Sequence, residues 1–167
     1  MLHPHTPDDC AALLEALRAQ NLTIATAESC TGGLIAAALT AIAGSSSSVL
    51  GGFVVYSNAM KTAQLGVPEG VLAAVGAVSE AVARLMAEGA LARSGADIAL
   101  SCTGIAGPGG ATPGKPVGLV HMAAARRGGR TIHLARIFPG DRGEVRAATV
   151  DAALGLARQA MADSAGI

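Results

Sequence analysis

The segment LTIATAESCTGGLIAAALTAI, residues 22–42, decides the fold class of this chain. It begins with a short apolar run that ends before a polar turn, which predicts a strand over Leu22–Thr26. It ends with a longer run of alanine, leucine and isoleucine, which predicts a helix over Leu34–Ile42. A strand that leads directly into a helix is the repeating unit of an α/β sheet.

The rest of the chain continues this alternation. Strands are expected at four further places: Phe53–Tyr56, Ile98–Cys102, Val117–Ala125 and Thr131–Phe138. The last two flank Gly128-Gly129 and should form a hairpin. Helices are expected at five places: Asp8–Arg18, Asn58–Gly66 with Asn58 as cap, Pro68–Val75, Ser79–Gly95, and from Asp141 onward with Glu144 completing a capping box. This order predicts one α/β domain, residues 1–167, built as a three-layer α/β/α sandwich with a mixed sheet.

Composition and charge narrow the function classes. Apolar residues make up 51% of the chain, and Phe53, Tyr56 and Phe138 are the whole aromatic set, so the core must be built from Ala, Leu, Val and Ile. Twelve basic residues balance twelve acidic ones. Proteins that bind nucleic acids usually carry a basic surplus or stacking aromatics. We therefore expect no nucleic-acid partner.

The sequence also limits where the protein works. The uncharged stretch Thr31–Met60 contains no apolar piece longer than the ten residues Leu34–Ala43, whereas a membrane-spanning helix needs about 20. The first residues show no signal-peptide pattern, and the three cysteines are odd in number and lack metal-ligand spacing. We expect a cytoplasmic protein with reduced thiols and no membrane contact.

Three loops that follow predicted strands carry the residues that could perform chemistry, because ligands collect beyond strand ends in α/β sheets. The first loop is TAESCTGG, residues 26–33. Ser29 could be a nucleophile there, and the amides of residues 31–33 could hold an anion or an oxyanion. The alternative is that Ser29 or Thr31 merely caps the helix. Cys30 is a rival nucleophile, although such a cysteine is more often buried and inert.

The second loop is YSNAMK, residues 56–61, which places Lys61 in the first turn of a helix. A cation is unfavourable at that end because the helix dipole is already positive, and both this field and burial lower the pKa of an amine. A base that works near neutrality needs such a lowering from about 10.4. The chain has ten arginines but only two lysines, Lys61 and Lys115, and only lysine can accept a proton. Lys61 is therefore the candidate base, while a solvated surface role stays open for Lys115.

The third loop begins at Ser101, and nine of the fifteen residues from Gly104 to Gly118 are Gly or Pro. Glycines allow backbone amides to face a ligand, which makes Thr103, Gly104 and Gly107 candidate binding residues. The pattern matches neither a Walker A sequence nor a dinucleotide fingerprint. A shaped turn before the hairpin is the alternative.

Arg142 and Arg146 lie one turn apart near the start of the last predicted helix. Cations are unfavourable there unless an anion joins them, so the pair could form a phosphate site together with free backbone amides. A salt bridge to Glu144 or to a neighbouring acidic residue is the alternative, and the pattern does not decide between the two interpretations.

The histidines predict no metal site. His3 and His5 lie in a terminus that is expected to fray. His121 and His133 are on opposite arms of the hairpin and could face each other, but two ligands without a third do not make a metal centre.

These segments together resemble the C-terminal domain family of the competence/damage-inducible protein CinA. The matching pieces occur in order along nearly the whole chain: TAESCTGG, GGFVVYSNAMK, GAVSEAVA, SCTGIAGPGGATPGKPVGLV and FPGDRGEVR. A mild departure is GGAT in the Gly-rich loop, where GGGT is frequent. Larger CinA proteins carry an additional N-terminal domain, for which 167 residues leave no room, so the stand-alone form is expected.

The resemblance implies a nicotinamide mononucleotide deamidase, which hydrolyses the carboxamide to give nicotinate mononucleotide and ammonia in pyridine-nucleotide recycling. It implies a catalytic serine and lysine, which correspond to Ser29 and Lys61, with Tyr56 near them, and no metal or organic cofactor. With the loops above, the expected substrate-binding residues are Thr31, Gly32, Gly33, Asn58, Thr103, Gly104, Gly107, Arg142 and Arg146. The alternative is a non-catalytic nucleotide-binding or regulatory module, and self-association into a homo-oligomer stays open.

The mechanistic hypothesis is that neutral Lys61 takes the proton of Ser29, which then attacks the amide carbon. Amides near residues 31–33 or 103–104 would hold the oxyanion, and Arg142 or Arg146 would hold the 5′-phosphate of the mononucleotide. Tyr56 could hydrogen-bond Lys61 or Ser29.

Overall fold

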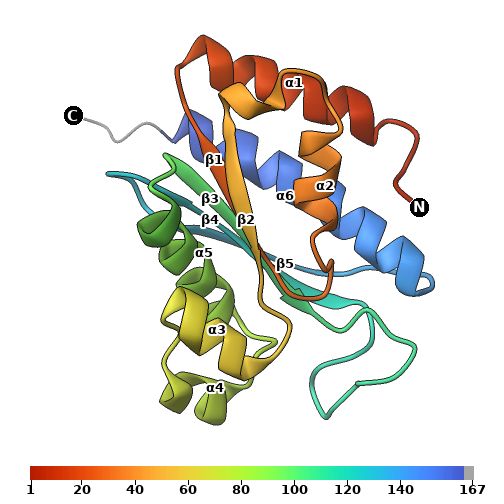
Figure 1. The fold of residues 1–167 in the computed structure, drawn as a ribbon. Helices are drawn as coiled ribbons and strands as arrows, with labels where there is room; N and C mark the ends of the chain where they lie inside the picture. Colours follow the sequence, from red (N-terminus) through yellow and green to blue (C-terminus); the bar gives the residue numbers. More distant parts are fainter. Residues whose placement is uncertain (164–167) are drawn as a thin grey trace.

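The computed structural model describes residues 1–163, and a five-stranded mixed sheet forms its centre (Figure 1). The strands are β1 (Ile24–Glu28), β2 (Val49–Val54), β3 (Ile98–Gly104), β4 (Leu119–Arg126) and β5 (Ile132–Ile137). They lie in the order β2-β1-β3-β4-β5; the first three are parallel, and β4 and β5 form an antiparallel hairpin beside β3. The predicted α/β class and mixed sheet are confirmed.

Helices cover both faces of this sheet, which confirms the three-layer arrangement (Figure 1). One face carries α1 (Thr6–Ala19), α2 (Leu34–Thr40) and α6 (Arg142–Ala162). The opposite face carries α3 (Asn58–Leu65), α4 (Glu69–Val75) and α5 (Glu80–Ser94). A short 3₁₀ helix, η1 (Ser45–Ser47), leads from α2 toward β2.

Alternate strand residues supply two cores, one on each side of the sheet. Ile98 and Leu100 of β3 pack with side chains of α1, α2 and α6, whereas Ala99 between them faces the α5 side. Burial of each large aliphatic side chain contributes about 1.5–3 kcal/mol. Alanines of β4, Ala123 and Ala125, meet alanines of α5, so that helix lies close to the sheet. Within residues 1–163, no helix has both the length and the apolar character needed to cross a bilayer.

Two strands are displaced from their expected positions. β1 covers Ile24–Glu28 instead of Leu22–Thr26, and β2 begins at Val49 instead of Phe53. Position 52 of β2 requires glycine because β1 and α2 approach the strand closely there. A Cβ on Gly52 would lie 2.4 Å from the Thr26 hydroxyl oxygen. The paired glycines Gly51 and Gly52 would be expected to weaken a strand, but here they allow close packing.

The cap of α3 is also one residue earlier than expected. Ser57, in an extended conformation, accepts a hydrogen bond from the Met60 amide through its Oγ (3.2 Å), and Asn58 is the first helical residue. Serine and asparagine cap equally well, so residue type did not distinguish them. The predicted Ser79 cap and the Asp141–Glu144 capping box are confirmed.

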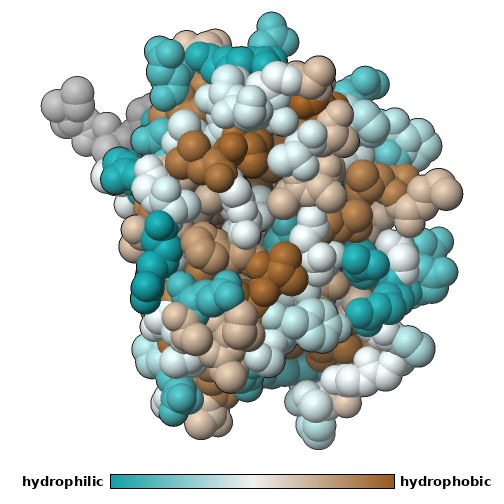
Figure 2. All heavy atoms as spheres, in the orientation of Figure 1, coloured by the Kyte–Doolittle hydropathy of each residue, from teal (hydrophilic) through white to brown (hydrophobic). Residues whose placement is uncertain are grey.

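The edge strand β2 brings apolar side chains to the surface. Leu50 is 51% exposed and Val54 is 50% exposed. Figure 2 shows apolar patches on this face of the molecule, interrupted by hydrophilic residues. The sheet edge that leads to α3 is therefore apolar and uncharged.

Gly89 sets the distance between α5 and α3, and its substitution tests the packing. A Cβ on Gly89 would lie 2.1 Å from the Leu65 carbonyl oxygen, so Gly89→Ala must push the two helices apart. We expect the free energy of unfolding to fall by about 1–3 kcal/mol. The matched control is Gly155→Ala in α6, where a Cβ meets nothing within 4 Å and alanine should stabilise the helix by up to about 1 kcal/mol. Urea denaturation that finds the two variants equally stable would contradict the close contact.

Candidate functional site

The candidate site lies at the carboxyl ends of β1 and β3, where the chain changes direction across the sheet. The chain leaves β1 toward β2 on one side and then continues to β3 on the other, a switch point at which open α/β sheets bind ligands. Ser29 follows β1 directly, and its amide donates to the Cys102 carbonyl of β3 (3.1 Å). The Val55 amide, just after β2, donates to the Glu28 carbonyl (2.9 Å). Three strand ends are thus held together around Ser29.

Lys61 extends from α3 into this cluster and reaches Ser29. Its Nζ lies 3.0 Å from Ser29 Oγ, 2.9 Å from the Val55 carbonyl and 3.2 Å from the Tyr56 carbonyl. Lys61 is 1% exposed and Ser29 is 8% exposed. The structure therefore brings the two residues of the expected catalytic pair into direct contact.

The two backbone carbonyls restrict what the Lys61 amine can do toward Ser29. A carbonyl oxygen can only accept, so each one must face an N–H of Lys61. A neutral amine has two N–H groups and one lone pair. When both N–H groups point to the carbonyls, the lone pair is left for the Ser29 hydroxyl. In that protonation state Ser29 donates and Lys61 accepts, which is the arrangement of a general base and its nucleophile.

The surroundings of Lys61 favour its neutral form. Burial lowers the pKa of Lys61, opposed by the negative charge that thiolates at Cys30 and Cys102 would carry. None of the ion pairs within residues 1–163 includes Lys61. An amine that is desolvated without an anionic partner loses its proton more readily than one in water.

Cys30, the rival nucleophile, is held in the protonated thiol form, which does not suit a nucleophile. A hydrogen bond with the Cys102 side chain, followed by burial, raises the pKa of the Cys30 thiol well above its ordinary value. The thiol, which is a poor nucleophile, is then the form present near neutrality. A neutral Cys30 also removes one of the charges that would oppose the lowering of the Lys61 pKa.

Glu28 is a structural centre of the site that the sequence analysis left without a role. It is fully buried, and its carboxylate accepts hydrogen bonds from three amides and two hydroxyls. The donors, at 2.6–3.1 Å, are the amides of Gly33, Ile35 and Ala36 and the hydroxyls of Thr26 and Thr31. A carboxylate is favourable here because the amides belong to the positive start of α2. The signal in the sequence was an acidic residue shortly before a helix start.

Glu28 corrects the expected role of residues 31–33. The Gly33 amide is bound by Glu28 (3.1 Å) and the Gly32 amide by the Ser29 carbonyl (3.0 Å), so neither is free for an oxyanion. Thr31 is fully buried, and its hydroxyl also lies 3.0 Å from Cys102 Sγ. The anion at this helix start is therefore the protein's own side chain.

Tyr56 contributes to the site through its backbone. Its carbonyl accepts from Lys61, but its side chain is turned outward: the residue is 62% exposed, and its hydroxyl accepts from Arg142 (3.1 Å). The expected hydrogen bond from the phenol to Lys61 or Ser29 is not formed. Neighbouring side chains of an extended segment point to opposite sides, so the buried Val55 leaves Tyr56 outside.

Arg146 contacts the turn that contains Ser29, and Arg142 lies against Tyr56 and the Gly-rich loop. Arg142 also donates to the Gly107 carbonyl (3.0 Å), and Arg146 donates to the Thr31 carbonyl (2.7 Å). The Arg146 Nε is buried and has no hydrogen-bond partner among the described residues. Two guanidinium groups thus lie beside the site with bonds to uncharged oxygens only.

The alternative salt bridge between these arginines and Glu144 is not formed. Glu144 turns back to accept from the Asp141 amide (2.7 Å) as part of the capping box. Over residues 1–163, neither Arg142 nor Arg146 joins an ion pair. Their positive charges remain available to an anionic ligand.

The Gly-rich loop borders the site mainly through its backbone. Gly107, at φ +85°, presents its carbonyl to Arg142, and a Cβ there would lie 2.6 Å from Val117 Cγ1. The Thr103 hydroxyl donates to the Ala77 carbonyl (2.9 Å), and a Cβ on Gly104 would lie 2.7 Å from the Leu119 carbonyl. Thr103 and Gly104 thus tie the loop to its neighbours.

Two of the singled-out residues lie apart from the Ser29–Lys61 contact. Asn58 is exposed and lines a cavity of about 290 Å³ between α3 and α4, together with Glu69 and Leu72. The Lys115 amine donates to the Val75 carbonyl at the end of α4 (2.6 Å). Of the two lysines, only Lys61 reaches the candidate nucleophile.

The lowered pKa of Lys61 should make stability depend on pH. In the unfolded chain the lysine regains its ordinary pKa of 10.5. Between the lowered folded-state value and 10.5, the unfolded chain binds more protons, so the free energy of unfolding rises with pH. Lys61→Met removes this titration. We expect the difference in the free energy of unfolding, wild type minus Lys61→Met, to grow as the pH rises from the lowered folded-state pKa of Lys61 toward 10.5, by at most about 1.4 kcal/mol per pH unit. Urea denaturation across this range measures it, and a constant difference would mean an ordinary Lys61.

The match to known proteins extends over nearly the whole chain. The family model described as CinA C-terminal domain matches residues 9–161. The crystal structure of the competence/damage inducible protein CihA from Agrobacterium tumefaciens is 45% identical, with a TM-score of 0.93 over 96% of this chain and 98% of that one. The crystal structure of the competence damage-inducible protein A (ComA) from Klebsiella pneumoniae is 40% identical, with a TM-score of 0.90 over 94% of this chain and 97% of that one.

Curated relatives are longer. A CinA-like protein of Chlorobium phaeovibrioides is 62% identical over 115 residues, which are 69% of this chain and 27% of that protein. A CinA-like protein of Gemmatimonas aurantiaca is 50% identical over 161 residues, which are 95% of this chain and 37% of that protein. The chain therefore spans roughly a third of the length of these relatives. On the family match and the structural likeness together, the chain belongs to the CinA C-terminal domain family.

Proposed function

We propose that this protein is an amidohydrolase that converts nicotinamide mononucleotide and water to nicotinate mononucleotide and ammonia. The observation that carries the proposal is the 3.0 Å contact between Lys61 Nζ and Ser29 Oγ, made by an amine whose other contacts are two carbonyls. Such a pair supplies a nucleophile and its base without a histidine or a metal ion. The substrate follows from the resemblance of the matching sequence segments to the CinA family.

The reaction proceeds in two balanced halves. Neutral Lys61 takes the proton of Ser29 as Ser29 Oγ bonds to the carboxamide carbon. The C–N bond then breaks, and the Lys61 ammonium gives its proton to the departing nitrogen, which leaves as ammonia. This leaves an ester between Ser29 and the nicotinoyl group. Water, deprotonated by the same amine, attacks that ester, and the proton returns to Ser29 Oγ.

The oxyanion formed in each half needs donors other than the amides at the start of α2. The Gly32 and Gly33 amides are already bonded, so we assign this role to the amides of Cys30 and Thr31, which directly follow the nucleophile. The hydrogen bonds that hold the Glu28 carboxylate also fix the geometry of this turn.

The 5′-phosphate of the substrate is assigned to Arg142 and Arg146. Arg146 contacts the Ser29 turn, and Arg142 contacts Gly107 and Tyr56, whose own carbonyl accepts from Lys61. Neither arginine is paired with a carboxylate among residues 1–163, and the buried Arg146 Nε still has a donor to offer. A dianionic phosphate matches two guanidinium groups in charge and hydrogen bonding. In this assignment the Tyr56 hydroxyl positions Arg142.

The test of the catalytic pair is ammonia release from nicotinamide mononucleotide by purified protein. Ser29→Ala and Lys61→Arg should each lower kcat by at least about 10³-fold, because one removes the nucleophile and the other replaces the base with a group that stays protonated. Lys115→Arg is the matched control and should keep near-normal turnover, since the Lys115 amine contacts only the end of α4. Normal turnover in either site variant would refute the assignment. Wild-type protein that binds the mononucleotide but releases no ammonia would instead support the non-catalytic module.

A separate measurement, the KM of arginine variants, tests whether Arg142 and Arg146 bind the phosphate. Arg142→Gln and Arg146→Gln should each raise KM for nicotinamide mononucleotide about 10–100-fold, the effect of losing a hydrogen bond between charged groups. With nicotinamide riboside, which lacks the phosphate, both variants should match wild type. Arg158→Gln, on the same helix but paired with Asp9, serves as control. An equal loss on both substrates would mean that the arginines support the fold of the turn and do not bind phosphate.

A further inference from the structure

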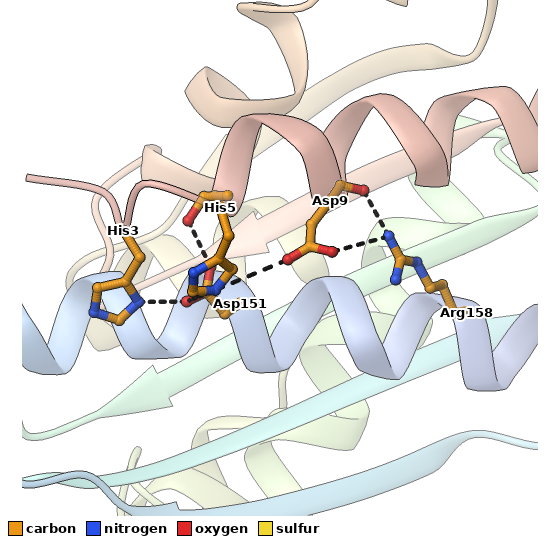
Figure 3. A network of polar contacts seen from close by, with 6 residues as sticks. His3, His5, Asp9, Asp151 and Arg158 are labelled. Carbon is orange, nitrogen blue, oxygen red and sulfur yellow. Dashed lines mark hydrogen bonds and ion pairs between the residues drawn. The ribbon is translucent and has the colours of Figure 1, made fainter.

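Two histidines near the N-terminus and an aspartate on α6 converge on one point, away from the catalytic pair. Figure 3 shows His3 and His5 directed at Asp151 across the gap between the start of α1 and α6. One ring nitrogen of each histidine and one carboxylate oxygen of Asp151 lie within 4.8 Å of one another. This terminus was expected to fray, but its histidines contact a residue about 150 positions away along the chain.

The contacts at this point are unusual because both rings share one oxygen. His3 Nδ1 contacts Asp151 Oδ2, and His5 Nε2 lies 3.1 Å from the same atom. The two rings are nearly parallel, with centroids 5.5 Å apart. The other carboxylate oxygen, Oδ1, accepts from the Thr6 hydroxyl (2.6 Å), which leaves Oδ2 directed at the histidines.

We propose that His3, His5 and Asp151 form a binding site for one divalent transition-metal ion of the Zn²⁺ type. Two imidazole nitrogens and one carboxylate oxygen are a ligand set that suits zinc and not magnesium or calcium, which prefer oxygen ligands throughout. Zinc with three protein ligands completes its tetrahedron with water. Ligand atoms on such a tetrahedron are roughly 3.3 Å apart, so small side-chain rotations close the observed arrangement around an ion.

The neighbouring side chains are those that a metal site needs. Metal-bound carboxylates are held by a further hydrogen bond, and the Thr6 hydroxyl provides one to Asp151. Asp9 Oδ2 lies 3.9 Å from His5 Nε2 and adds negative charge beside the proposed ion, while Arg158 holds the other oxygen of Asp9 (3.4 Å; Figure 3). His3 and His5 are partly exposed, so an ion can enter from solvent.

A metal ion here would fasten the N-terminal segment to the longest helix of the fold. The ligands join residue 3 to residue 151, so the ion would oppose unfolding of α1 from α6. The site shares no residue with the Ser29–Lys61 cluster. The inference therefore stands or fails independently of the proposed deamidase activity.

Isothermal titration of the full, untagged chain with ZnCl₂ tests the proposal, with Co²⁺ as a spectroscopic substitute. We expect one ion per chain, visible absorption of tetrahedral Co²⁺, and a rise in Tm of about 5–10 °C when free Zn²⁺ is 100-fold above its Kd. His5→Ala and Asp151→Asn should weaken Zn²⁺ binding at least about 100-fold, and Thr6→Val about 10-fold.

The matched control is the double variant His121→Ala/His133→Ala. Those histidines also lie together, with ring nitrogens 3.0 Å apart, but belong to the β4–β5 hairpin. The control should bind Zn²⁺ like wild type. Absence of saturable binding to wild type, equal binding by His5→Ala, or loss of binding in the hairpin control would each overturn the proposal. In the first two cases the three side chains would form only a hydrogen-bonded cluster.

Discussion

The buried carboxylate of Glu28 is the interaction on which the site depends. It is the last residue of β1, and it binds the first amides of α2, so it determines how the chain turns between the two elements. Ser29 sits at the start of that turn and has little freedom, because its amide and its carbonyl are both bonded. A fully buried charge is tolerable only when several donors surround it, and here five do so. The hydrogen bonds that satisfy this one carboxylate thus help to fix the turn that begins with Ser29, the candidate nucleophile.

Glu28 and Lys61 are buried next to Ser29 and are of opposite charge type, yet they do not pair. Glu28 directs its carboxylate to α2 on one side of the sheet, and Lys61 comes from α3 on the other. A direct salt bridge would raise the pKa of the lysine and keep it protonated. By satisfying Glu28 with amides and hydroxyls and Lys61 with carbonyls, the fold keeps the charges apart and leaves the amine able to accept a proton. The sheet itself separates them.

Much of this arrangement could be predicted because it follows from local patterns. The strand–loop–helix alternation indicated the three layers, and the placement of Ser29 and Lys61 in loops after strands made both candidates for a ligand site. The remaining features depend on which way a side chain turns. Ser57 and Asn58 are equivalent as caps by type, the outward turn of Tyr56 depends on Val55 facing inward, and β2 runs through glycines that pattern alone reads as a break. The histidines near the N-terminus gained their partner Asp151 from tertiary packing, which no local pattern records. The partners of Glu28 are all local, and its place just before a helix start was the signal available in the sequence.

The position of Tyr56 has a practical consequence. The chain contains no tryptophan and a single tyrosine, and that tyrosine is exposed, with its hydroxyl bonded to Arg142. Tyrosine absorption and emission of the whole molecule therefore come from one ring, at longer wavelengths than the weak absorption of Phe53 and Phe138. If Arg142 holds the phosphate as proposed, the protein carries a built-in optical probe in direct contact with a ligand-binding side chain.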